Sequence, residues 1–146
     1  MRIVLDTDVM VAAMRSDQGA SRQLLLAALD RRIVALASVP LMLEYEAVLT
    51  RPEHLDWIGL TAGEVNQVLD ALAAVVERVP LRFHWRPQLG DPNDEMVLET
   101  AVNGSADRLA TFNMRHLGPA ARTFGIGAAQ PGVIWREIRG AGYEKK

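Results

Sequence analysis

The sequence has no cysteine, no long hydrophobic run and almost no lysine. Without cysteine, the chain has no disulfides, no thiolate zinc site and no cysteine nucleophile. No apolar run approaches the roughly 18 residues that a membrane-spanning helix needs. We also expect no signal peptide, because Asp6 and Asp8 interrupt the apolar stretch at the N-terminus. These absences lead us to expect a soluble cytoplasmic protein.

A generally basic surface is absent as well. The net charge is −2 and the pI is about 5.9, which argues against a basic coat for nucleic acids. However, nearly all the basic residues are arginine, the better bidentate partner for phosphate. A net acidic protein can still hold a polyanion where metal ions supply positive charge. The bulk charge therefore decides little about the partner.

The composition that is present suits a single α/β domain. The 146 residues, 49% hydrophobic and 23% charged, predict one domain over residues 1–146 without repeats, linkers or low-complexity segments. Apolar runs predict strands at residues 2–6, 32–37, 78–83, 107–112 and 122–126. Caps and helical spacing predict helices from about residue 9 and at 19–30, 40–50, 61–76, 91–103 and 131–138. This alternation predicts a three-layer α/β/α fold with a parallel sheet and the first strand in a central position.

The first strand ends on an acid. In parallel sheets chemistry collects at the carboxyl ends of the strands, so Asp6 and the segment after Thr111 are expected at one edge. Asp6 alone is equally well explained as a helix cap. We expect Asp8 to be the cap instead, because it lies nearer the helix predicted to begin near Val9.

Other acids follow on the helices. Glu44 and Glu46 flank the apolar stripe of one helix on opposite sides, about 100° from its centre, and either also suits a solvated flank. Asp91 is expected to cap the next predicted helix. Asp94 lies on the buried side of that helix, where a carboxylate costs desolvation unless it is paired or binds metal. Asp107 starts its strand about 13 Å from the catalytic edge and is excluded.

Polar residues follow the 107–112 strand directly. Asn113 offers a neutral oxygen ligand or a hydrogen bond to a ligand. His116 suits a ligand, an acid or base, or a phosphate contact, while Arg115 and Thr111 are further candidates for contacts with substrate or ligand. Carboxylates that converge from different strands coexist around a cation, and oxygen ligands suit Mg²⁺ or Mn²⁺. Such a site typically activates water for attack on a phosphodiester.

Four segments, "LDTDV", "LEYEAVLTRP", "DPNDEMVLETA" and "LATFNMRHL", occur in an order that resembles the PIN-domain ribonucleases. Within them the chain is similar to the VapC-like bacterial toxin components of toxin–antitoxin systems. The resemblance runs from Arg2 to about Ala128. It implies a PIN-like fold, an RNA substrate, a Mg²⁺ or Mn²⁺ cofactor, an antitoxin protein as partner and a homodimer. We expect the dimer contact on the helix hairpin of residues 40–77.

The resemblance also implies roles for individual residues. Asp6, Glu44 and Asp94 match the metal-binding acids of the family. Asn113 matches a fourth catalytic position, where many members have Asp and others Asn. His116 stands where a further Asp often follows, so this chain departs from the family pattern there.

Two alternatives remain at this stage. "DTDVMV" also resembles the first motif of the haloacid-dehalogenase phosphatases, in which Asp6 would be the phosphorylated nucleophile. "GDPND" imitates their metal-binding motif but precedes "LATF" instead of following it, and the family's lysine is missing. The second alternative is a non-catalytic binding module whose acids serve as helix caps.

Overall fold

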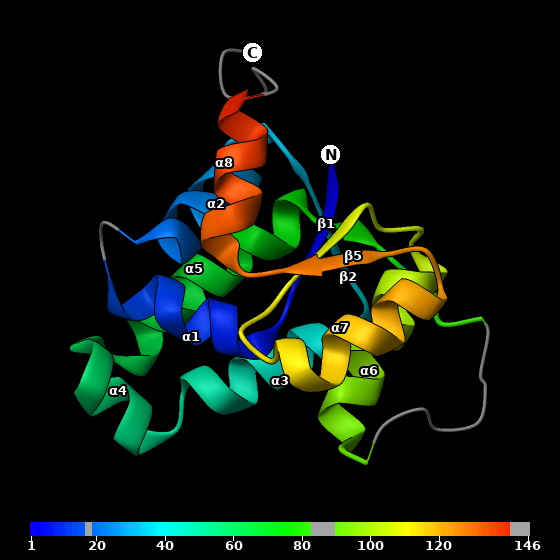
Figure 1. The fold of residues 1–146 in the computed structure, drawn as a ribbon. Helices are drawn as coiled ribbons and strands as arrows, with labels where there is room; N and C mark the ends of the chain where they lie inside the picture. Colours follow the sequence, from blue (N-terminus) through cyan, green and yellow to red (C-terminus); the bar gives the residue numbers. More distant parts are fainter. Residues whose placement is uncertain (17–18, 83–89, 141–146) are drawn as a thin grey trace.

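The strand that opens the chain lies at the centre of a five-stranded sheet (Figure 1). The computed structural model describes residues 1–16, 19–82 and 90–140. The strand order is β3-β2-β1-β4-β5, and every pairing is parallel. The strands are β1 (Arg2–Leu5), β2 (Val34–Ala37), β3 (Glu77–Arg78), β4 (Arg108–Ala110) and β5 (Gly127–Ala129). The predicted parallel sheet with a central first strand is confirmed.

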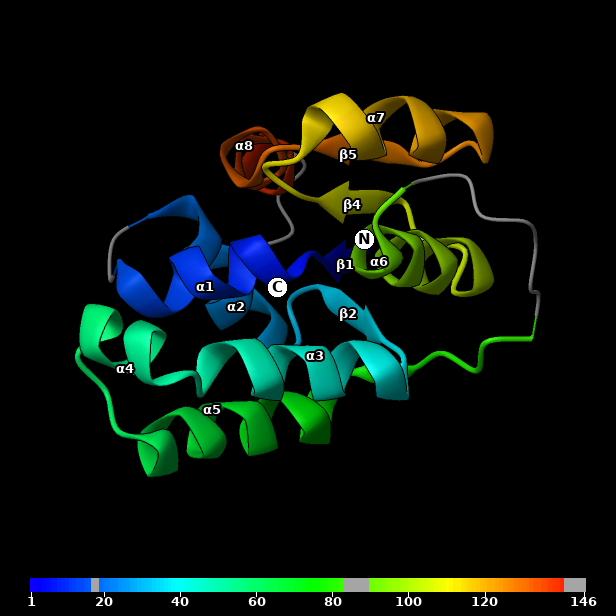
Figure 2. The ribbon, with the colours of Figure 1, turned by 90° about the horizontal axis from the view of Figure 1, so that it is seen from below.

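Helices cover both faces of this sheet (Figure 2). Those of the first half are α1 (Thr7–Arg15), α2 (Ala20–Leu29), α3 (Val39–Leu49), α4 (Pro52–Ile58) and α5 (Ala62–Val75). Those of the second half are α6 (Pro92–Asn103), α7 (Met114–Thr123) and α8 (Pro131–Gly140). Helices α1, α2 and α8 lie on one face, α6 and α7 lie on the other, and α3 packs against both α1 and α6. The predicted three-layer α/β/α architecture is confirmed.

Local signals set most of the helix boundaries. The Ser38 hydroxyl accepts from Leu41 N–H at the start of α3. Thr61 and Glu64 form the predicted capping box of α5, in which each side chain accepts a backbone N–H of the other residue. Asp91 caps α6 by accepting from Asn93 N–H at 2.8 Å, as predicted.

The structure differs from the sequence-based prediction around two further helices. Helix α4 follows directly where only a helix break was predicted, because Pro52 is tolerated in a first helical turn. Helix α7 was not predicted, because Gly118 and Pro119 inside it are poor helix formers. Amphipathic packing outweighs that propensity, since Leu117, Gly118 and Ala121 are buried.

Two strands also differ from their predicted positions. The last strand is not at residues 122–126, which end α7 and form the following turn, but at Gly127–Ala129. Strand β3 covers Glu77–Arg78, so it begins before the predicted 78–83 segment, of which Phe83 lies outside the described residues. Both are short strands at the edges of the sheet, where the apolar pattern in the sequence is weakest.

The carboxyl ends of the central strands are held at one level by backbone hydrogen bonds. Asp6 N–H donates to Ala110 O at 2.9 Å, and Thr111 N–H donates to Ala129 O at 3.1 Å. The strand interior below this edge is fully apolar, with Ile3, Val4 and Leu5 buried. Within the described part of the chain, no helix has the length and apolar character to cross a membrane.

Candidate functional site

Asp6 is a buried carboxylate at the tip of the central strand. It is the N-cap of α1 and only 7% exposed. One carboxylate oxygen accepts from Thr7 N–H at 2.7 Å, and the other accepts from the Thr111 hydroxyl at 2.6 Å. Burial raises the pKa of Asp6, while the hydrogen bonds from Thr111 and Thr7 act in the opposite direction. The fold therefore fixes this acid in one orientation.

The expectation that Asp8 rather than Asp6 caps the first helix was wrong. Helix α1 begins at Thr7, two residues before the predicted start, so Asp6 is the cap and Asp8 lies in the first turn. Asp8 Oδ2 accepts from Phe112 N–H at 3.1 Å, which ties α1 to the segment after β4. The strand runs into the helix without a loop, and this leaves no room for a later cap.

Asp8 is a member of the acidic site that sequence reasoning missed. Burial and the neighbouring charge of Asp6 raise the pKa of Asp8 to about 7. Its Oδ1 atom is buried and has no hydrogen-bond partner among the residues that the structure describes. The sequence held one signal for this role. Asp6 and Asp8 are two residues apart and lie on either side of the junction between a strand and a helix.

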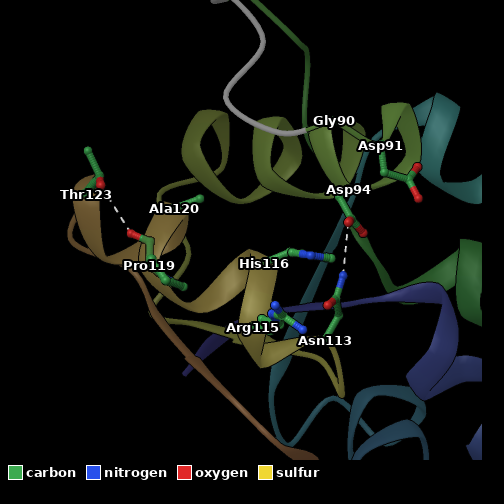
Figure 3. A pocket seen from close by; sticks show the side chains of 9 residues that line it. All are labelled: Gly90, Asp91, Asp94, Asn113, Arg115, His116, Pro119, Ala120 and Thr123. Carbon is green, nitrogen blue, oxygen red and sulfur yellow. Dashed lines mark hydrogen bonds between the residues drawn. The ribbon is translucent and has the colours of Figure 1, made fainter.

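Asp94 and Asn113 form the other side of the site. Asp94 lies in the first turn of α6, and Asn113 stands at the start of α7. Asn113 Nδ2 donates to Asp94 Oδ2 at 3.0 Å (Figure 3). Burial and the charges of Asp91 and Asp6 raise the pKa of Asp94, while His116 and the bond from Asn113 lower it. The charge of Asp6 thus contributes to the raised pKa of Asp94, and their sharing of one metal site stays a prediction.

A cleft opens beside this pair, with a volume of about 920 Å³. Figure 3 shows Asp94 on one wall and the first turn of α7 on the other, with His116 directed toward the Asp94–Asn113 pair. Arg115 also lines the cleft, and the side chains of Arg115 and His116 are exposed. Asp91 and Asp94 therefore share this cleft with two basic residues, Arg115 and His116.

Thr111 does not line this cleft, although it was a candidate for a ligand contact. It is fully buried, and its hydroxyl donates to Asp6 and accepts from Asn113 N–H at 2.9 Å. Thr111 therefore connects the acid at the tip of β1 to the start of α7. It acts on the site by positioning Asp6 and Asn113.

The two glutamates of α3 differ in exposure. Glu44 is half-buried and Glu46 is exposed. Glu44 precedes Tyr45, a buried residue whose hydroxyl donates to the carbonyl oxygen of Leu5. Glu44 lies on α3, which packs against both α1 and α6. These two helices carry Asp8 and Asp94, respectively. Its role as a metal ligand stays a prediction.

Asp107 lies at the opposite edge of the sheet, as predicted. Its Oδ2 accepts from Arg2 N–H at 2.8 Å, at the beginning of β1 and β4. It therefore pairs with the start of the central strand and takes no part in the acidic site.

The donors at this edge fit a hard cation such as Mg²⁺ or Mn²⁺. They are carboxylate and amide oxygens, and the buried unpaired Oδ1 of Asp8 is an oxygen that a cation would satisfy. A cation would also offset the mutual repulsion that contributes to the raised pKa values of Asp8 and Asp94. Among the described residues, no three His, Asp or Glu side chains lie close enough together to hold a metal ion in the positions seen in this structure.

Comparison with known proteins identifies relatives of this architecture. The family model for the PIN domain matches residues 2–115. A chain in the crystal structure of VapBC2 from Rickettsia felis, bound to a DNA fragment from their promoter, superposes with a TM-score of 0.57. The two sequences are 15% identical, and the match covers 89% of this chain and 98% of that one. This likeness concerns the fold. A search of the curated proteins finds no match.

Proposed function

The chain belongs to the PIN-domain family, whose members are nucleases, and we propose that it is a Mg²⁺- or Mn²⁺-dependent endoribonuclease. The observation that carries the proposal is the placement of Asp6, Asp8 and Asp94 at one sheet edge, where burial raises the pKa of each carboxyl and the charge of Asp6 adds to the rise at Asp8 and Asp94. Carboxylates held together in this way are suited to bind a cation. Without a cation, their burial and repulsion lower the stability of the folded protein.

We propose that Asp6, Glu44 and Asp94 hold the metal, with Asp8 as an additional acid next to Asp6. When bound, the metal would supply a water of lowered pKa and neutralise charge on the phosphate. The chain's own groups orient the site. Thr111 holds the Asp6 carboxylate, and Asn113 holds that of Asp94.

The basic wall of the cleft has a matching role in this proposal. Arg115 and His116, in the first turn of α7, line the same cleft as Asp94, so they would bind the phosphate groups of the substrate. Because the net charge is −2, a local arrangement of this kind is needed to hold a polyanion.

We also propose that the protein is the toxin of a toxin–antitoxin pair and that it forms a homodimer. The support for the antitoxin is the fold shared with a chain of VapBC2. Support for a dimer contact on the hairpin of residues 40–77 comes from its first helix, α3, on which Leu43 is 60% exposed and Val39, directly before the hairpin, is 45% exposed. Exposed apolar side chains on one helix favour contact with another protein surface.

The site geometry favours a nuclease over the phosphatase alternative. The segment "GDPND" begins helix α6 and precedes β4, whereas the phosphatase motif would follow that strand. A non-catalytic module would have no use for the raised carboxyl pKa values, which cost stability at neutral pH.

The decisive experiment incubates the purified full chain with labelled RNA, with and without Mn²⁺, beside an Asp6→Asn variant. We expect cleavage that requires both Mn²⁺ and Asp6, and no hydrolysis of a small phosphate monoester in a parallel assay. Hydrolysis of the monoester in place of RNA would support the phosphatase alternative. Absence of both activities, together with no binding of Mn²⁺, would leave the non-catalytic module.

A further inference from the structure

Helix α3 is joined to the tip of the central strand by a buried side chain. Tyr45 is 2% exposed, and its hydroxyl donates to the carbonyl oxygen of Leu5. Leu5 is the last residue of β1, and Asp6 follows it directly. A buried carbonyl without a partner destabilises the fold, so this hydrogen bond ties the helix to the strand tip.

The peptide unit between Leu5 and Asp6 is held from both sides. Its carbonyl oxygen accepts from Tyr45 on α3, and its N–H donates to Ala110 O on β4 at 2.9 Å. Because a peptide unit is planar and includes the following Cα atom, the two bonds fix its orientation. Helix α3 as well as β4 therefore determines where the Asp6 side chain begins.

Glu44 stands beside Tyr45 on the same helix, and it is half-buried. The Cα atoms of neighbouring residues are only about 3.8 Å apart, so a shift of α3 at Tyr45 also moves Glu44. One buried hydrogen bond thus joins the residue before Asp6 to the residue after Glu44. These two acids are proposed metal ligands from different elements of the fold.

The beginning of α3 is fixed to the helix that carries Asp94. The hydroxyl of Ser38, the N-cap of α3, lies 2.8 Å from the hydroxyl of Thr100 on α6, and both residues are buried. Helix α3 therefore carries Glu44 itself and has buried bonds to the two elements that end in Asp6 or contain Asp94. Its placement sets how the proposed ligands lie relative to one another.

The Tyr45 hydroxyl is not placed to transfer a proton to a substrate. Its side chain is buried, and its hydrogen is donated to Leu5 O. Burial and the charge of Asp6 raise the pKa of Tyr45, so the hydroxyl stays a protonated donor. Tyr45 therefore acts on the site through the position of other groups.

We propose that Tyr45 is a positioning residue of the metal site, which sets the distance between Asp6 and Glu44 through its hydrogen bond to Leu5 O. The inference rests on the proposed function, in which both acids are metal ligands. Mg²⁺ needs oxygen ligands at closely defined distances. A small shift of α3 relative to β1 therefore weakens metal binding in addition to stability.

Tyr45→Phe tests the proposal, because it removes the hydroxyl and keeps the ring in the core. The variant should fold, with a lowered Tm in EDTA. Calorimetric titration of the full chain with Mn²⁺ gives the Kd. We expect the variant to bind Mn²⁺ roughly ten-fold more weakly than the parent chain, at the lower end of the effects of groups that orient metal ligands.

Ile138→Val is the matched control for the loss of stability. Ile138 is fully buried on α8, next to Glu137, whose carboxylate pairs with Arg108 at the start of β4. This places the control near the opposite edge of the sheet. Loss of a buried methylene should lower the Tm and leave the Kd for Mn²⁺ unchanged. Equal weakening by Ile138→Val would overturn the positioning role, because reduced stability would then be the cause.

A double-mutant cycle identifies the ligand that Tyr45 places. In a Glu44→Gln background, Tyr45→Phe should weaken Mn²⁺ binding much less than in the parent chain, because the placed ligand is already lost. In a Glu46→Gln background, where an exposed neighbour is altered, the full weakening should remain. An effect of full size in the Glu44→Gln background would overturn the inference.

Amide hydrogen exchange in EDTA supplies a measurement that does not depend on metal. The Asp6 amide should exchange faster in Tyr45→Phe, by a larger factor than the amides of α8, because the opening is local to the strand tip. Equal exchange at Asp6, or an equal Kd for Mn²⁺, in the variant and the parent chain would overturn the proposal. A parent chain that binds no Mn²⁺ would instead defeat the proposed function, and the exchange result would still decide whether Tyr45 fixes the strand tip.

Discussion

Thr111 donates its hydroxyl hydrogen to Oδ2 of Asp6 at 2.6 Å, and so connects the residue after β4 to the residue after β1. Both side chains are buried, and the same hydroxyl accepts from Asn113 N–H. Residues 105 positions apart in the sequence therefore form one fixed unit at the carboxyl edge of the sheet. The position of Asp6 depends on the parallel pairing of β1 with β4.

Thr111→Val tests this unit. Valine has a similar shape but removes both hydrogen bonds, and a buried group left without its partner costs about 1–3 kcal/mol. We expect a lower free energy of unfolding by that amount and slower RNA cleavage, because the Asp6 carboxylate loses its orientation. Urea denaturation and a cleavage assay provide the measurements.

Asp6→Asn should abolish cleavage without unfolding the protein. Asparagine is as good an N-cap as aspartate, and loss of the charge relieves the repulsion with Asp8 and Asp94. In EDTA the Tm should be equal to or above that of the parent chain. Mn²⁺ should raise the Tm of the parent chain only.

Asp107→Asn provides the matched control at the opposite edge of the sheet. It should keep the parent cleavage rate and the parent response to Mn²⁺. Cleavage that survives Asp6→Asn without metal would contradict the proposed mechanism.

The stability of the metal-free protein should fall as the pH rises from about 4 to about 7. The unfolded chain loses the Asp8 proton near the ordinary carboxyl pKa of about 4, whereas the folded protein holds it to about 7. Between these values the folded state binds more protons, so the free energy of unfolding decreases with pH. Asp8→Asn should flatten this dependence in a Tm series measured in EDTA. An unchanged slope in the variant would show that other groups cause it.

The two glutamates of α3 form a matched pair for testing the metal ligands. We expect Glu44→Gln to reduce the Mn²⁺-induced rise in Tm and the cleavage rate, because Glu44 is the half-buried residue on the side proposed for the metal. Glu46→Gln alters an exposed side chain and should change neither. The opposite pattern would assign the ligand to Glu46 and show that the choice of Glu44 was wrong.

His116→Asp probes the position at which this chain departs from the family pattern. If His116 replaces an acidic ligand, the variant should bind Mn²⁺ more tightly and cleave at least as fast. If His116 instead contacts phosphate or donates a proton, the variant should bind Mn²⁺ well but cleave poorly. Calorimetric titration with Mn²⁺ and single-turnover cleavage separate the two outcomes. Unchanged metal binding and unchanged cleavage would remove His116 from the site.

The elements predicted correctly are those whose signals are local. The apolar run of β1, the Thr61–Glu64 capping box and the Asp91–Pro92 start of α6 each specify an element within a few residues. Helix α7 was missed for the opposite reason. Gly118 and Pro119 disfavour it locally, and burial of one face against β5 and α6 stabilises it. Propensity is a weak signal where tertiary contacts decide.

The sequence by itself determined the fold class and most of the elements, because neighbouring residues specify periodicity, caps and strand ends. It also led to the prediction, still to be tested, that Asp6, Glu44 and Asp94 share a metal site. Only the tertiary structure decided how those acids are held. The role of Asp8, the bond from Thr111 to Asp6 and the bond from Asn113 to Asp94 all join segments distant in sequence. Burial and mutual charge, which shift the carboxyl pKa values, exist only once the strands and helices have packed together.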